Sequence, residues 1–366
     1  MLRILVILCY LIVNSLFILK YGDRQELIPN YILLITYNLF IIIGITIINK
    51  FNNRLKRFSG FNLTFIIISI IVLGCFFVIN ILIDSETLNV DRWSALEGFI
   101  RSVLEGKYPY NIKDHLGQTS SNLPGLFYLG LPFYFLGDIG FLQCVVFALL
   151  MFCIYKSSLE NHVKTILVFL LLLSPAYLWE ISVKSDLMSN LFLVVIFISF
   201  WKKKFPNISF SKPVLLSFFC AFFALTRGIV LIPLIIFLFK DFIKTDVKIK
   251  VYFLVGLLVF SFLISLPVLV LIPNYETLVV HNPFNHQVRY APIILIIMSL
   301  LVPFLFSFKV KNNGDVFYHS FLIITLLMFI TFTINLYEEG FTANIYGDVF
   351  DLSYLGMIIP FVIFYL

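Results

Sequence analysis

Charged side chains are scarce in this sequence, and many of them stand at the ends of long apolar runs. The charges that could take part in chemistry on one side of these runs are Asp84, Glu86, Asp91 and Arg92; Glu180, Lys184 and Asp186; Arg227 and Arg289; Glu338 and Glu339; and Asp348 and Asp351. Short apolar segments separate them, so they can converge around one cavity. Arginine and lysine would hold a phosphate leaving group there, while a carboxylate takes the proton of a neutral acceptor.

The composition indicates whether these groups belong to a water-soluble protein or to a membrane protein. Of 366 residues, 61% are hydrophobic and 13% are charged, whereas a soluble domain is about 45–50% apolar and about 25% charged. The same composition excludes a disordered chain and a nucleic-acid-binding module. A nucleic-acid partner would also need a contiguous basic face, and no basic cluster exceeds four charges. The five cysteines all lie inside apolar runs, so we expect neither disulfides nor a cysteine metal site. The chain is predicted to be a multi-pass membrane protein.

The apolar runs predict an all-α membrane protein with about twelve transmembrane helices (range 10–13) in one domain over residues 1–366. Roughly 20 apolar residues are needed for each crossing. The predicted spans are 4–20, 30–48, 62–83, 139–155, 165–182, 187–201, 213–226, 228–239, 251–272, 292–308, 318–336 and 352–366. The first is expected to be retained, since no small-residue cleavage site follows it. Prolines at 124 and 132 make 123–137 a re-entrant or interfacial segment.

The distribution of basic residues predicts the orientation. With both termini in the cytoplasm, 17 of the 26 basic residues and 4 of the 20 acidic residues lie inside, which leaves 9 basic and 16 acidic residues outside. An excess of lysine and arginine on the cytoplasmic side is typical of membrane proteins. We therefore predict a multi-pass protein of the cell (inner or plasma) membrane.

One long extracytoplasmic loop is predicted, over residues 84–122. Within it, Trp93, Leu96, Ile100, Val103 and Leu104 recur at helical spacing, with charges on the opposite face. Such an amphipathic helix is expected to lie along the outer leaflet. The alternative is a solvated helix without lipid contact.

The order of motifs in and after this loop carries a resemblance. The motifs are Asp91-Arg92-Trp93, then Gly106-Lys107-Tyr108-Pro109-Tyr110, then Asn122-Leu123-Pro124-Gly125, and finally Leu131-Pro132 before Leu136-Gly137. The order resembles the first extracytoplasmic loop of GT-C glycosyltransferases, especially the bacterial enzymes that use polyprenyl-phosphate mannose. Lys184-Ser185-Asp186-Leu187 and Thr226-Arg227-Gly228 stand where those enzymes carry a polar turn and a basic residue between two spans. The resemblance covers roughly residues 84–240.

The resemblance implies a GT-C fold and an inverting transfer of a monosaccharide, such as mannose, from a polyprenyl-phosphate donor to a glycan or lipid acceptor on the outer face. It implies that Asp91 is the catalytic base, with Asp84 and Glu86 as the other nearby acids. The other residues expected to bind the donor phosphate or substrate are Arg227, Lys184, Asp186, Arg289, His286 and Tyr110. The paired acidic D-x-D of some relatives is missing, so we expect no metal ion and no cofactor. Besides these substrates, the partners would be membrane lipids, with no nucleic acid.

Each assignment has a purely structural alternative. Asp91 would cap the helix that begins at Arg92, and Arg227 would extend its charge to the lipid headgroups. Lys184 and Asp186 would form an ion pair within a tight turn. His286 and Arg289 would belong to an ordinary hydrated loop, and Tyr110 would anchor at the interface rather than stack on a sugar.

Two other functions compete with the enzyme. A secondary transporter also often has twelve crossings, but it usually shows related halves and charges at mid-membrane. In this chain the two halves are unlike and charges within the predicted spans are almost absent. A polysaccharide polymerase or ligase also uses lipid-phosphate substrates, but tends to carry its large outer loop late in the chain. A structural membrane protein without activity is a further alternative.

Overall fold

The structure is a computed structural model that describes residues 2–206, 208–288, 290–347 and 349–366, without the side chains of residues 285 and 286. The first part of the chain forms α1 (Leu2–Gly22), α2 (Asn30–Lys50), α3 (Asn52–Arg57), α4 (Phe61–Leu82), η1 (Ser85–Thr87), α5 (Arg92–Leu104), η2 (Pro109–Asn111) and α6 (Pro124–Phe135). The middle forms α7 (Phe141–Lys156), α8 (Asn161–Leu172), α9 (Pro175–Ser182), α10 (Leu187–Lys204), α11 (Pro213–Ala224), η3 (Gly228–Val230), α12 (Leu231–Lys244) and α13 (Val247–Leu269). The last part forms α14 (Tyr275–Val280), α15 (Pro283–Gln287), α16 (Ile293–Ser307), α17 (Asn313–Glu339), α18 (Phe341–Ile345), α19 (Ser353–Gly356) and α20 (Ile359–Tyr365).

The fold is that of a helical membrane protein. The part of the chain that the structure describes contains no strand, and every predicted span contains a helix. Five helices are long and apolar enough to cross a bilayer, namely α1, α2, α4, α13 and α17, and the bent pair α8–α9 makes up to six. Shorter apolar helices occupy four other predicted spans: α7, α11, α16 and the segment 353–365. The all-helical class is confirmed, while the predicted number of twelve crossings goes beyond these five or six.

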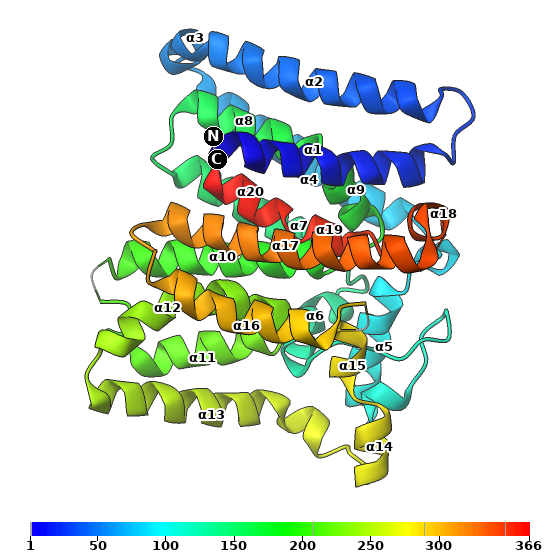
Figure 1. The fold of residues 1–366 in the computed structure, drawn as a ribbon, viewed down its shortest axis with the longest axis vertical. Helices are drawn as coiled ribbons and strands as arrows, with labels where there is room; N and C mark the ends of the chain where they lie inside the picture. Colours follow the sequence, from blue (N-terminus) through cyan, green and yellow to red (C-terminus); the bar gives the residue numbers. More distant parts are fainter. Residues whose placement is uncertain (1, 207, 289, 348) are drawn as a thin grey trace.

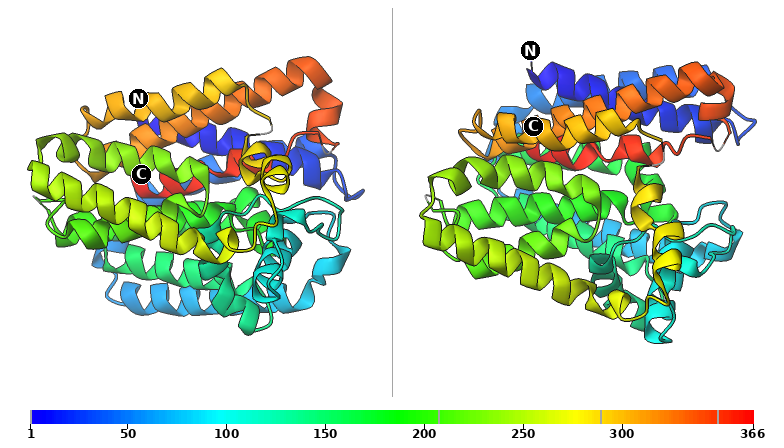
Figure 2. Two further views of the ribbon diagram at one scale, coloured as in Figure 1. Left: turned by 90° about the horizontal axis from the view of Figure 1, so that it is seen from below. Right: turned by 60° about the horizontal axis from the view of Figure 1, so that its bottom comes forward.

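The long helices run side by side, and the two ends of this bundle differ (Figure 1). Both termini lie at the end that also holds α3. The opposite end carries α5, α14, α15 and α18, and α5 runs across the direction of the long helices. Two further views show the same separation (Figure 2).

The core centres on α10, whose residues Asn190, Phe192, Val194, Val195 and Ile198 are almost completely buried. This helix packs against α7, α12, α17 and α20. Its central position fixes the turn before it, which holds Asp186.

The bend of 57° between α8 and α9 has an identifiable cause. Pro175 begins α9 and has no N–H to donate, so the helix cannot continue across it. Asn14 of α1 satisfies the polar groups that the break exposes, because its Oδ1 accepts hydrogen bonds from the Ser174 hydroxyl at 2.7 Å and from the Ala176 N–H at 3.1 Å. The break thereby directs α9, and Trp179 on it, toward the end of the bundle that carries α5.

The amphipathic pattern of 92–105 does form a helix, and protein covers the middle of its apolar face, while Leu104 is exposed. Leu96, Phe99 and Ile100 are buried in a second cluster that includes Leu126 and Phe127 of α6 and Val268 of α13. These three side chains therefore contact protein, which differs from the lipid contact that was expected for this face. Periodicity shows which face of a helix is apolar, but lipid and a neighbouring helix satisfy that face equally well.

Segment 123–137 was expected to be re-entrant or interfacial, and it forms the twelve-residue helix α6. Its start lies against the end of α11, where the Gly125 N–H donates to the Leu225 carbonyl at 2.7 Å. A Cβ at this position would lie 2.7 Å from two backbone oxygens, so only glycine permits the approach. This contact brings Asn122 beside the residues that follow α11.

Candidate functional site

A polar cavity of about 360 Å³ opens at the end of the bundle that carries α5. Its lining comes from the end of α1, the start of α5, loop 116–122, α9, and the segments around Arg227, Tyr290 and Asp351. The lining includes Lys20, Tyr21, Arg24, Asp91, Arg92, Gln118, Ser121, Asn122, Trp179, Arg227, Tyr290, Asp351 and Tyr354. Acids and bases far apart in sequence thus converge on one cavity, although only some of those expected there take part.

Asp91 lines this cavity from the residue before α5. It occupies the position of a helix cap, but its side chain makes no capping hydrogen bond. Asp84 and Glu86 are exposed and line neither of the two cavities described here. Asp84 instead accepts a hydrogen bond from the Glu86 N–H at 3.1 Å and caps η1. Of the three acids, Asp91 is the one that faces the cavity.

Asp114, which was not among the predicted site residues, lies close enough to Asp91 for their charges to interact. Its Oδ1 accepts hydrogen bonds from the N–H groups of Leu116 and Gln118, each at 2.9 Å. Burial raises the pKa of Asp114 above its usual value, and the charge of Asp91 raises the pKa further, against the lowering effect of the two hydrogen bonds. These bonds hold the turn of loop 113–119, where Lys113 and Thr119 form an isolated bridge.

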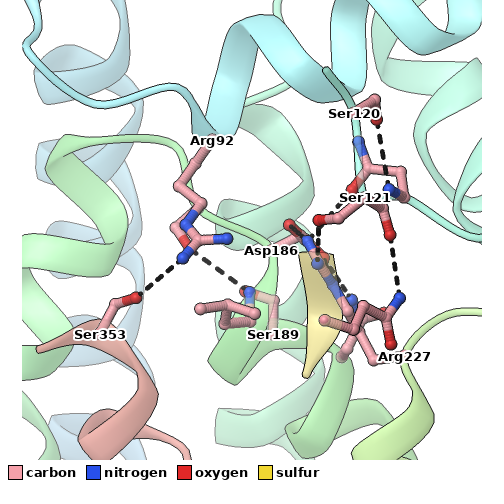
Figure 3. Close-up of polar contacts among 12 residues, drawn as sticks. Arg92, Ser120, Ser121, Asp186, Ser189, Arg227 and Ser353 are labelled. Atoms are coloured by element: carbon pink, nitrogen blue, oxygen red, sulfur yellow. Dashed lines mark hydrogen bonds and ion pairs between the residues drawn. The ribbon is translucent and has the colours of Figure 1, made fainter. Parts of the chain in front are cut away.

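Arg92 and Asp351 form an ion pair across the cavity wall. Arg92 Nη2 also donates to the Ser353 hydroxyl at 3.3 Å (Figure 3). The Arg92 guanidinium carbon lies 5.3 Å from the centre of the Tyr354 ring. Burial alone would raise the pKa of Asp351, but the Arg92 charge and the hydrogen bonds from Ser353 outweigh it, so this pKa lies below its usual value. The pair joins the start of α5 to the segment before α19.

Arg227 and Asp186 form a second ion pair, with two hydrogen bonds of 3.0 and 2.6 Å from Nε and Nη2. Both side chains are buried. Arg227 Nη2 also donates to Asn122 Oδ1 at 3.1 Å, and Asp186 Oδ2 accepts from Asn190 Nδ2 at 2.6 Å. Figure 3 shows Arg227, Asp186 and Ser121 meeting from separate segments. The structure therefore brings together two of the residues expected in the site.

Lys184 has a different partner from the one considered in the sequence analysis. Its Nζ lies 2.6 Å from Asp138 Oδ2, not on Asp186, and it lines neither cavity. Its backbone φ of 54° is unusual for a residue other than glycine. Lys184 thus shapes the turn that presents Asp186, and nothing in its position directs it to a phosphate.

Tyr110 is also buried, with 4% of its surface exposed. Its ring packs on Phe99 and Tyr108, and its hydroxyl donates to the Asn122 carbonyl at 2.7 Å. It lines neither cavity and holds the backbone of Asn122. The other two predicted site residues lie outside the described part of the chain, Arg289 completely and His286 with its side chain.

Gln287, next to His286, is described and connects three loops. Its side chain donates to the Ser121 carbonyl at 2.9 Å and accepts from the Gly228 N–H at 3.0 Å. The segment after α14 is thereby attached beside Arg227.

An apolar groove of about 260 Å³ adjoins the polar cavity. α12, α16 and α17 contribute Ile232, Leu300 and Met328 among its lining residues. Four residues line both spaces, namely Arg227, Tyr290, Phe350 and Tyr354. Arg227, whose guanidinium is buried, thus lies where the polar cavity meets the apolar groove.

Several cavity residues had no place in the predicted site. Lys20, Arg24, Asn122, Trp179 and Tyr354 all line the cavity. Asn122 belongs to the quoted Asn-Leu-Pro-Gly motif, and Lys20 and Arg24 lie at and just after the end of the first predicted span, so both signals were present in the sequence. Within the described residues, no group of three or more His, Cys, Asp or Glu side chains is arranged to hold a metal ion.

No family model, curated protein or solved structure matches this chain. The resemblance to GT-C glycosyltransferases thus depends on the sequence motifs.

Proposed function

We propose that this protein is a membrane glycosyltransferase of GT-C architecture, which moves a monosaccharide such as mannose from a polyprenyl phosphate to a glycan or lipid acceptor on the outer face of the membrane. One observation carries the proposal: Arg227 lines both the polar cavity and the apolar groove. A sugar linked through phosphate to a polyprenyl chain has the same sequence of polar, anionic and apolar parts. Its phosphate would bind at Arg227, with the sugar in the cavity and the first isoprene units in the groove.

Arg227 can accept this ligand although it is already paired. Its Nε and Nη2 bond to Asp186 and Asn122, whereas Nη1 has a long contact of 3.5 Å with the Ser121 hydroxyl. Arginine carries five N–H donors, so a phosphate oxygen can take the Nη1 side without breaking the ion pair. Asp186 and Asn122 would then fix the orientation of the guanidinium.

The proposed reaction is a single displacement. The acceptor hydroxyl attacks the anomeric carbon, the bond from that carbon to the phosphate oxygen breaks, and its electron pair leaves with the phosphate. The acceptor proton passes to the carboxylate of Asp91. A positioned base typically contributes about 10²–10⁴ in rate, and direct attack inverts the anomeric carbon. The leaving phosphate gains charge that Arg227 stabilises, so this scheme uses no metal ion.

The proposal includes the topology of the chain. Twelve crossings would result if α7, α10, α11, α12, α16 and the segment 353–365 also span the membrane, beside the five long helices and the bent pair. The placement of both termini at the end away from the cavity supports cytoplasmic termini and an outward-facing site (Figure 1).

The test is the release of polyprenyl phosphate from polyprenyl-phosphate mannose by the purified protein in nanodiscs. Water serves first as acceptor, followed by methyl glucuronide and methyl glucoside. We expect release by the native protein and a rate at least about a hundred-fold lower in Asp91→Asn. The proposal fails if native protein and Asp91→Asn release the lipid at equal rates, or if neither polyprenyl-phosphate mannose nor polyprenyl-phosphate glucose is bound or cleaved.

A further inference from the structure

Among the described residues, the polar cavity has more basic than acidic lining residues, which is the reverse of the charge balance predicted for its side of the protein. The predicted orientation places 9 basic and 16 acidic residues on that side. The described charged residues that line the cavity are the basic Lys20, Arg24, Arg92 and Arg227 and the acidic Asp91 and Asp351. The excess of cations inside an otherwise acidic surface points to an anionic ligand.

These cations differ in how far the protein already neutralises them. Arg92 is paired with Asp351, and Arg227 with Asp186. Arg24 is exposed and, among the described residues, has no carboxylate within ion-pair distance. Lys20 donates to the Gly347 carbonyl at 3.0 Å. Arg24 therefore keeps its full charge for a ligand that enters the cavity.

Aromatic rings hold Arg24 at this wall. Its guanidinium carbon lies 4.8 Å from the centre of the Tyr21 ring. The Tyr21 ring in turn lies 6.1 Å from the Trp179 ring, and the Phe17 ring contacts both of them, at 5.9 Å from Tyr21 and 5.7 Å from Trp179. Tyr21, Trp179 and Arg24 all line the cavity. A cation beside aromatic side chains suits a saccharide ring that carries a negative charge.

This wall is separate from the one that holds Arg227. Arg24 follows α1, and Arg227 precedes α12; Figure 1 shows these two helices on opposite sides of α10 and α17. An anion at Arg24 is consequently distinct from the donor phosphate proposed at Arg227. Asp91, which lines the same cavity, would serve the acceptor between them.

We propose that Arg24 determines acceptor specificity by binding an anionic group, a carboxylate or a phosphate, which the acceptor carries beside a saccharide ring. The inference rests on the proposed function, because it names the substrate class that the same cavity accepts. Arg24 pairs with the acceptor anion, and the Trp179–Tyr21 wall contacts the ring.

The first experiment measures binding without turnover. Purified full-length protein is melted in the presence of methyl glucuronide, glucose 6-phosphate or neutral methyl glucoside. We expect the two anions to raise the melting temperature and the neutral glycoside to have no effect. Arg24→Gln should abolish the response to the anions, whereas the control Lys113→Gln, an exposed residue that lines neither cavity, should keep it. The carboxylate and phosphate arms show which anion is preferred.

The second experiment measures sugar transfer from polyprenyl-phosphate mannose to the same three acceptors. We expect native protein to favour an anionic acceptor by about ten-fold, as a charge-assisted hydrogen bond would give. Arg24→Gln should lose this preference, Arg24→Lys should keep part of it, and the KM for the donor should stay unchanged.

The outcomes separate the two proposals. Two results would overturn the role of Arg24 and leave the proposed transferase intact. One is donor cleavage by water without any preference among the acceptors. The other is an equal loss of transfer rate for all three acceptors in Arg24→Gln. Absence of donor cleavage overturns the transferase, and the melting experiment then still decides whether Arg24 binds an anionic saccharide. Melting that does not respond to either anion contradicts the proposal directly.

Discussion

Asp186 and Arg227 lie 41 residues apart in the sequence and meet in a buried ion pair, with bonds of 2.6 and 3.0 Å. Their positions follow from α10, which begins directly after Asp186, and from the break between α11 and α12, which contains Arg227. A buried pair is held by mutual neutralisation and by further hydrogen bonds, here from Asn190 and to Asn122. The pair therefore links stability to the orientation of the proposed phosphate-binding group.

Asp186→Asn should destabilise the protein strongly, because it leaves the Arg227 charge buried without a counter-charge. Removing one partner of a buried pair typically costs about 3–5 kcal/mol. The measurement is reversible or kinetic unfolding in detergent, with Glu105→Gln as the control, since Glu105 forms an exposed pair with Lys107. A loss no larger than that of Glu105→Gln would mean that the pair does not hold these segments together.

Asp91→Asn should fold normally and transfer sugar at least about a hundred-fold more slowly, since an amide cannot take the acceptor proton. Its side chain makes no capping bond in the structure, so the melting temperature should change little. Asp84→Asn and Glu86→Gln should cost much less activity, because both residues are exposed and away from the cavity. Turnover and a melting curve are measured for each variant. Full activity of Asp91→Asn together with inactive Asp84→Asn would assign the base to Asp84.

Arg227→Lys should raise the KM for the lipid donor by about ten-fold, which corresponds to about 1.4 kcal/mol. Lysine keeps the positive charge beside Asp186 but loses the planar group that bonds to two partners at once. The apparent KM is compared with that of Lys184→Arg, whose side chain pairs with Asp138 away from both cavities. Unchanged donor dependence in Arg227→Lys would leave Arg227 a structural role only.

Labelling with an impermeant thiol reagent tests the orientation. In a background without the five native cysteines, Gln118→Cys and Ser211→Cys place single thiols at exposed positions. Intact cells should be labelled at 118 and not at 211, because the excess of lysine and arginine predicts that 211 faces the cytoplasm. The reverse pattern would show that the predicted orientation is inverted and that the cavity faces the cytoplasm.

The sequence alone determined the class of the protein and the position of its helices. A chain with 61% hydrophobic residues must satisfy its backbone within helices if it enters a bilayer, and each predicted span does contain a helix. It also predicted that Asp91, Asp186 and Arg227 belong to the site, because polar groups beside apolar spans are costly and are kept for a purpose.

The tertiary structure alone decided which groups meet. Arg92 pairs with Asp351 across 259 residues, and Lys184 bonds to Asp138 instead of its near neighbour Asp186. The Tyr110 side chain is buried, and apolar residues of α5 pack against α6. Periodicity and spacing fix the direction of a side chain relative to its own helix. The partner of that side chain depends on how the helices pack against one another, and here the packing places Arg24 and Arg227 in the lining of one cavity.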